Sequence, residues 1–209
     1  MAMAGLLLAA CGESSSDANE PTGSYDVAVT EASFPAQQRL GQTSLLRLGV
    51  RNTGSKTVPA LTVTITIAGK LGTSSSLPFG IRDPQPGLAA ADRPVWVLAE
   101  TYPRLDGSSR PGGASTSNRK TFSFGALKPG QTTAAVWKLS AVRAGEYRVD
   151  YSVGAGLSDE VHAVTSGGGS PHGSLAAEIS RELPETEVKD NGEVVEIGAP
   201  QAGGAGAGG

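Results

Sequence analysis

The only thiol in this chain of 209 residues belongs to Cys11, which directly follows a short apolar segment. Residues 4–10 read AGLLLAA, far short of the roughly 20 apolar residues that a membrane-spanning helix needs. A short apolar segment that ends in small residues, here Ala9 and Ala10, is typical of a secretory signal just before its cleavage point. The first chemistry that the sequence indicates is therefore covalent modification of the Cys11 sulfur after export.

The four residues Leu8 to Cys11 resemble the lipobox of bacterial lipoproteins. The resemblance implies that the sulfur takes a diacylglyceryl group, that a peptidase cuts before Cys11, and that the lipidated cysteine becomes the N-terminus. Residues 1–10 would then be a signal peptide, and residues 11–23, which begin CGESSSD, a polar tether. Two or three acyl chains hold a protein stably on a membrane, so the resemblance predicts an extracytoplasmic protein anchored to the cell membrane.

The alternative is an unprocessed cysteine near the start of the chain. The first four residues, MAMA, lack the Lys or Arg that a secretory signal carries, and this favours the alternative. We interpret the missing charge as a sign that the true start codon lies upstream.

Histidine and aspartate side chains offer few further sites. His162 and His172 are the only histidines, and without a third ligand nearby in the sequence we interpret them as surface residues. Asp83, Asp92 and Asp106 lie in predicted loops and could bind Ca²⁺, but the loops lack dense alternating acids, which favours a role in turns. The sequence predicts neither a metal nor a cofactor.

A set of aromatic and basic residues flanks a Gly/Ser-rich loop. The aromatic rings could stack on a sugar, and the basic side chains could contact an anionic wall polymer. The alternatives are that the tryptophan packs in the core and that the charges are solvated. The candidate ligand contacts are Trp96, Tyr102, Arg104, Arg110, Arg119 and Lys120.

Sequence motifs of common enzymes are missing. The chain contains no G-x-S-x-G nucleophile elbow, no G-x-x-x-x-G-K-[ST] loop and no H-E-x-x-H pair, so we expect no enzymatic activity. The net charge is −3, and residues 174–209 carry most of the acidic excess. Neither part of the chain has the strongly basic character of a nucleic-acid-binding protein.

Apolar and polar residues alternate along most of the chain, which predicts strands. The apolar positions Tyr147, Val149, Tyr151 and Val153 are one example. Residues 174–181 fit a helix or a strand, and we choose a closing strand. Asn191-Gly192 predicts a hairpin turn. The predicted strands cover 25–30, 43–51, 61–67, 94–99, 121–127, 135–140, 147–153, 160–165 and 174–181.

This pattern predicts an all-β, immunoglobulin-like antiparallel β-sandwich with disordered termini. We place it at residues 24–182 with an insertion at 83–119, followed by an acidic extension or hairpin at 183–197 and a disordered Gly/Ala tail at 198–209. Because disulfides are excluded, the core must hold the fold, with Trp137, Tyr147 and Tyr151 as central candidates.

Two segments resemble CARDB-type (cell-adhesion-related) immunoglobulin-like domains. They are GQTSLLRLGVRNTGSKTVPALTVTI and LKPGQTTAAVWKLSAVRAGEYRVDYSV. The resemblance implies a secreted sandwich of the adhesion or spacer type and supplies no catalytic residue. The sequence therefore predicts a lipid-anchored protein with a non-enzymatic binding, adhesion or structural role at the cell envelope. An envelope protein or a cell-wall polymer would be its partner, and a carbohydrate-binding module is the alternative.

Overall fold

The computed structural model describes residues 21–69, 78–81, 94–115, 120–182, 185–192 and 194–197, and within them the chain forms strands and no helix. The predicted signal peptide, most of the tether and the Gly/Ala tail lie outside these residues, as do Cys11, Asp83, Asp92 and Arg119. None of the described residues belongs to a helix long and apolar enough to cross a membrane.

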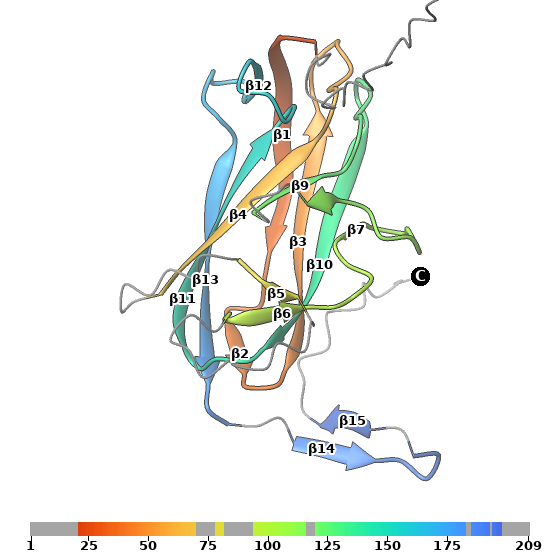
Figure 1. Ribbon diagram of the computed structural model, residues 1–209, viewed down its shortest axis with the longest axis vertical. Helices are drawn as coiled ribbons and strands as arrows, with labels where there is room; N and C mark the ends of the chain where they lie inside the picture. Colours follow the sequence, from red (N-terminus) through yellow and green to blue (C-terminus); the bar gives the residue numbers. More distant parts are fainter. Residues whose placement is uncertain are drawn as a thin grey trace, which may run out of the picture.

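Two sheets face each other, and a separate two-stranded hairpin lies beyond the lower end of the sandwich (Figure 1). The order of strands in the first sheet is β12 (Val161–Val164), β1 (Gly23–Ser33), β3 (Thr43–Asn52), β10 (Thr132–Ala141), β6 (Trp96–Leu98) and β5 (Gly80–Ile81), with β7 (Arg104–Leu105) also paired to β10. The order in the second sheet is β2 (Gln37–Arg39), β13 (His172–Ser180), β11 (Gly145–Gly154), β4 (Thr62–Gly69), β9 (Thr121–Ser123) and β8 (Ala114–Ser115). The hairpin consists of β14 (Glu185–Val188) and β15 (Val194–Ile197).

The predicted all-β sandwich is confirmed. Most neighbouring strands are antiparallel, but β1 pairs with β12, β13 with β2 and β5 with β6 in parallel, so both sheets are mixed. Alternation along 135–140 and 147–153 fits either the two strands of a hairpin or two strands of adjacent sheets. The structure places β10 in the first sheet and β11 in the second.

The core lies between the inner faces of the two sheets and consists of the apolar residues that alternate along the strands. From β3 it takes Leu46, Leu48 and Val50, each at most 1% exposed. Two aromatic groups organise it. Phe122 and Phe124 meet the Trp137 ring edge-on at centroid distances of 5.7 and 5.6 Å. Towards the end of the sandwich where β11 begins, Phe34 and Tyr147 meet the Trp96 ring edge-on, at centroid distances of 5.4 and 5.5 Å.

The described part of the 83–119 insertion closes one open side of the sandwich. Its strand β7 pairs with β10 of the first sheet, and β8 pairs with β9 of the second. The intervening chain is held by a hydrogen bond from the Gly112 N–H to the Pro103 carbonyl oxygen, 3.0 Å. Gly113 has a φ of 95°, and a Cβ there would lie 3.0 Å from both Phe124 and Pro103, so this tight crossing needs glycine.

Two buried hydroxyl groups make a matched test of the core. Ser44 Oγ is buried without a hydrogen-bond partner among the described residues, whereas Thr62 Oγ1, equally buried, donates to the Gly156 carbonyl oxygen at 3.2 Å. We expect Ser44→Ala to leave the free energy of unfolding unchanged or raise it by up to about 1 kcal/mol, because it removes an unpaired polar atom. Thr62→Val should lower it by about 1 kcal/mol. Urea unfolding of both variants measures the difference, and a larger loss for Ser44→Ala would contradict the assignment.

Candidate functional site

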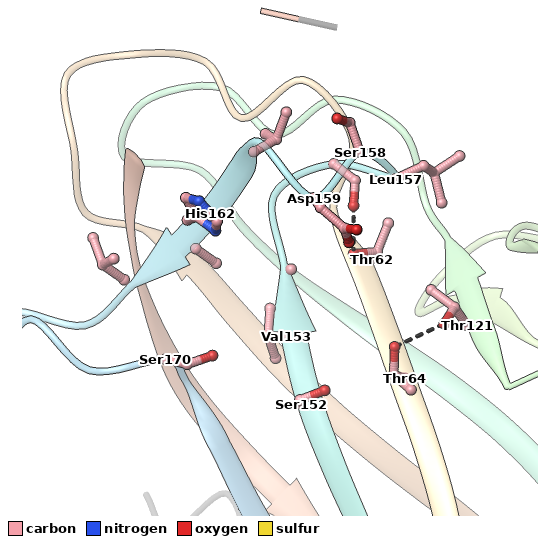
Figure 2. Close-up of a pocket in the computed structure, with 15 residues that line it drawn as sticks. Thr62, Thr64, Thr121, Ser152, Val153, Leu157, Ser158, Asp159, His162 and Ser170 are labelled. Carbon is pink, nitrogen blue, oxygen red and sulfur yellow. Dashed lines mark hydrogen bonds between the residues drawn. The ribbon is translucent and has the colours of Figure 1, made fainter. Parts of the chain in front are cut away.

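An open groove of about 770 Å³ lies at the end of the sandwich where β11 finishes. We call it the hydroxyl groove. It lies where β4, β9 and β11 of the second sheet meet β12 of the first sheet and the loop 155–160 (Figure 2). Its hydroxyl-bearing lining residues are Thr62, Thr64, Thr121, Ser152, Ser158 and Ser170.

The cross-strand register of the second sheet brings these hydroxyls together. Ser152 of β11 lies opposite Thr64 of β4, and Thr64 lies opposite Thr121 of β9. The hydroxyls of Thr64 and Thr121 hydrogen-bond to each other at 2.8 Å. Small β-branched and hydroxyl side chains suit such a pleated surface, and their alternation with core residues points them all to one face.

The loop 155–160 forms the upper wall of the groove and is fixed to both sheets. The Ala60 N–H donates to the Ala155 carbonyl oxygen at 3.0 Å, and the Gly23 N–H donates to the Glu160 carbonyl oxygen at 3.0 Å. The Thr62 hydroxyl donates to the Gly156 carbonyl oxygen in the same loop. Gly154 leaves room for this hydroxyl, because a Cβ at position 154 would overlap it. Thr62 is only 3% exposed because this loop covers it.

The groove has little charge. Asp159 and His162 are the two ionisable residues among those that line it. His162 stands on β12 of the first sheet, whereas the bonded pair Thr64 and Thr121 stands on the second sheet (Figure 2). Hydroxyl groups both donate and accept hydrogen bonds, so this surface suits a neutral polar ligand better than an ion.

A second cavity, of about 550 Å³, lies at the opposite end, where β11 begins. Two basic residues, Arg143 and Arg181, and two acidic residues, Glu146 and Glu178, line it around Tyr147. The Tyr147 hydroxyl donates to the Ala144 carbonyl oxygen at 3.1 Å, and burial raises the pKa of this tyrosine, an effect that Arg143 opposes. Tyr147 also contacts Trp96 in the core, so its ring has a structural role.

The structure corrects the prediction that Trp96 could contact a ligand. Its side chain is 0% exposed, and its Nε1–H donates to Gln38 Oε1 at 2.9 Å. A ring enclosed between Phe34 and Tyr147 cannot stack on a sugar. Trp96 instead packs in the core, which was the alternative interpretation of this residue.

The other candidate contacts do not gather in one place. Tyr102 is half-buried, and the Arg104 guanidinium carbon lies 4.4 Å from its ring centroid, so one ring face already holds a cation. Arg104 stands on β7 of the first sheet, whereas Lys120 precedes β9 of the second sheet, where its carbonyl oxygen accepts from the Ile65 N–H at 2.9 Å. Arg110 is exposed in a turn with Ser108.

An ion-pair network that sequence reasoning missed lies on the outer face of the first sheet. Arg47 on β3 contacts Glu31 at 3.1 Å and Asp106 at 2.7 Å. The hydrogen bond from Arg47 lowers the pKa of Asp106. Asp106, a candidate calcium ligand, thus fastens the loop after β7 to β3. Among the described residues no three His, Cys, Asp or Glu side chains are grouped to hold a metal ion.

Comparison with known proteins gives structural matches only. No protein-family model and no curated protein sequence matches this chain. The CARDB domain of a Pyrococcus furiosus protein, solved in complex with di-metal ions, is 14% identical, covers 75% of this chain and 89% of its own, and has a TM-score of 0.43. AvmM, which catalyses macrocyclization in alchivemycin A biosynthesis, is 10% identical over 78% of this chain and 94% of its own, with a TM-score of 0.44. A native alpha-2-macroglobulin fragment from Escherichia coli is 17% identical over 81% of this chain and 21% of its own, with a TM-score of 0.41. CARDB-type domains, which two sequence segments resemble, are thus among the similar structures, and at these scores the similarity fixes neither family nor function.

Proposed function

We propose that this chain is a lipid-anchored extracytoplasmic protein whose β-sandwich has a non-enzymatic binding, adhesion or structural role at the cell envelope. The observation that carries the proposal is the sequence around Cys11. The chain's single cysteine follows AGLLLAA and precedes a polar segment. The first strand begins at Gly23, twelve residues later, which leaves a tether between lipid and domain.

The sandwich is compatible with a lipidated Cys11, because its fold needs no cysteine. Its stability comes from a core shared by the two sheets, in which Trp96 and Trp137 are fully buried. A lipid on Cys11 therefore uses a sulfur that the fold does not require.

The hydroxyl groove supports a binding role, because hydroxyl groups both donate and accept hydrogen bonds and can be held in place by their neighbours. Thr64 and Thr121 bond to each other, and Thr62 bonds to a carbonyl oxygen. The binding surface we assign is this groove, in place of the predicted aromatic set around the buried Trp96.

Replacement of Cys11 tests the anchor. In cells that express the full chain, we expect wild-type protein in the membrane fraction and Cys11→Ala protein released from it, because one thioether-linked lipid group holds the chain. The matched control Ser14→Ala, three residues along the same tether, should stay with the membrane. Equal fractionation of wild type and Cys11→Ala would contradict the proposal.

A further inference from the structure

The sandwich has two chemically different ends, and the chain leaves it at both. We call one the entry end. It contains the first residue of β1, the last residue of β3 and the first residue of β10, since Gly23 pairs with Val161 and Arg51 pairs with Thr132. At the other end β13 finishes at Ser180 beside β2, and the acidic hairpin follows from Glu185 (Figure 1).

Three basic residues stand at the entry end on segments that one buried residue joins. Asn52 Nδ2 donates to the carbonyl oxygens of Lys56 and Leu127, each at 2.8 Å, which places the turns that carry Lys56 and Lys128 side by side. Arg51 directly precedes Asn52 on β3. The side chains of Arg51, Lys56 and Lys128 are exposed, and within the described part of the chain none of them forms an ion pair.

Acidic residues at this end lie over the other strands. Asp159 and Glu160 directly precede β12, whereas the Asp26 carboxylate of β1 lies against Gly54, in the turn that also carries Lys56. The entry end therefore has a basic cluster over β3 and β10, with Asp26 at its border, and two acidic residues beside β12. The opposite end carries the hairpin segment 185–197, which has five acidic residues and one lysine.

We propose that the β3–β10 side of the entry end faces the membrane, and that Arg51, Lys56 and Lys128 contact the headgroups of anionic phospholipids, while the hydroxyl groove beside β12 at the same end stays open to solvent. This inference rests on the proposed lipid anchor. The twelve Cα-to-Cα steps from Cys11 to Gly23 would span at most about 40 Å if fully extended and about 20 Å as a flexible chain. The ten residues of β3 or β10 add about 34 Å, which holds the acidic hairpin away from the membrane.

The tether makes a weak surface contact effective. A basic residue near an anionic membrane raises partition about fivefold, and Asp26 offsets one of the three positive charges, so the cluster favours the docked orientation by on the order of twentyfold. Because the tether already confines the domain to the membrane, this contact needs to orient the sandwich and not to recruit it. The β12 side of this end, with Asp159 and Glu160, should tilt away from the same surface.

Single reporter cysteines test the orientation in the full lipidated chain, whose Cys11 sulfur is blocked. A fluorophore at Ser55→Cys reports the entry end, and one at Asp190→Cys reports the hairpin. In vesicles with about a third anionic lipid, we expect a headgroup-attached quencher to quench the Ser55→Cys label several times more strongly. Equal quenching of the two labels by a lipidated chain overturns this inference alone, whereas a chain without lipid on Cys11 contradicts the anchor as well.

Charge reversal separates lipid contact from the geometry of the tether. Arg51→Glu, Lys56→Glu and Lys128→Glu together should reduce quenching at Ser55→Cys to the level found in zwitterionic vesicles. The matched control Arg110→Glu, Lys138→Glu and Arg181→Glu changes the net charge equally at exposed positions elsewhere and should have no effect. An equal loss in both triple variants, or no loss in either, would overturn the headgroup contact.

Discussion

Trp137→Ala should lower the free energy of unfolding by about 3–5 kcal/mol, the loss typical of deleting a large buried aromatic side chain. Trp137 is 0% exposed, and Phe122 and Phe124 both pack edge-on against its ring. Removing the indole would leave a cavity between the two sheets, bordered by Phe122 of β9 and by Phe124, which directly follows this strand.

Urea unfolding at pH 7 measures this loss, with Lys138→Ala as the control at the next, exposed position of β10. The control should change stability by less than about 0.5 kcal/mol. Trp137→Phe provides a second check. Because Trp137 Nε1 has no hydrogen-bond partner among the described residues, this variant loses ring volume but no hydrogen bond, and should cost clearly less than alanine. A loss below about 1 kcal/mol for Trp137→Ala would contradict the packing described.

Asn52→Asp should lower the free energy of unfolding by nearly as much, although it replaces only one heavy atom of the side chain. Asn52 is fully buried, donates from Nδ2 to the Lys56 and Leu127 carbonyl oxygens, and accepts from the Gly54 N–H at 3.0 Å. A carboxylate there would face two carbonyl oxygens without a proton to donate. We expect a loss of about 3–5 kcal/mol, as for other uncompensated buried charges.

The pH dependence identifies the cause of this loss. Burial beside two carbonyl oxygens should raise the pKa of the introduced carboxyl group in the folded state above its unfolded value of about 3.9. The folded variant then binds a proton more readily than the unfolded chain, so its deficit relative to wild type is full at neutral pH and shrinks as the pH falls towards 4. Asn191→Asp, the same change in an exposed hairpin turn, should have little effect. A deficit independent of pH would contradict the explanation.

Sequence periodicity predicted the core well because strand alternation is a local property. Residues such as Leu48, Ile65 and Val149 alternate with polar neighbours, and burial followed that pattern. Strand pairing depends on residues far apart in the chain. The parallel pairing of β12 with β1 and the division of β10 and β11 between two sheets therefore could not be read from any single segment.

The candidate site was less predictable for the same reason. Thr64, Thr121 and Ser152 gather only through the register of three strands, and their residue types are common on any exposed β-surface. Trp96 precedes a loop rich in polar residues, and its burial depends on Phe34 and Tyr147 from distant strands. Tyr102 and Lys120, close in sequence, belong to segments attached to different sheets.

The most direct test of the proposed anchor is the intact mass of the mature protein purified from membranes of the cells that express it. The account predicts a chain that begins at Cys11, heavier than the polypeptide 11–209 by a diacylglyceryl group, with or without an additional acyl chain. A chain that retains residues 1–10 and a free thiol at Cys11 would contradict the lipid anchor and the membrane-facing entry end together.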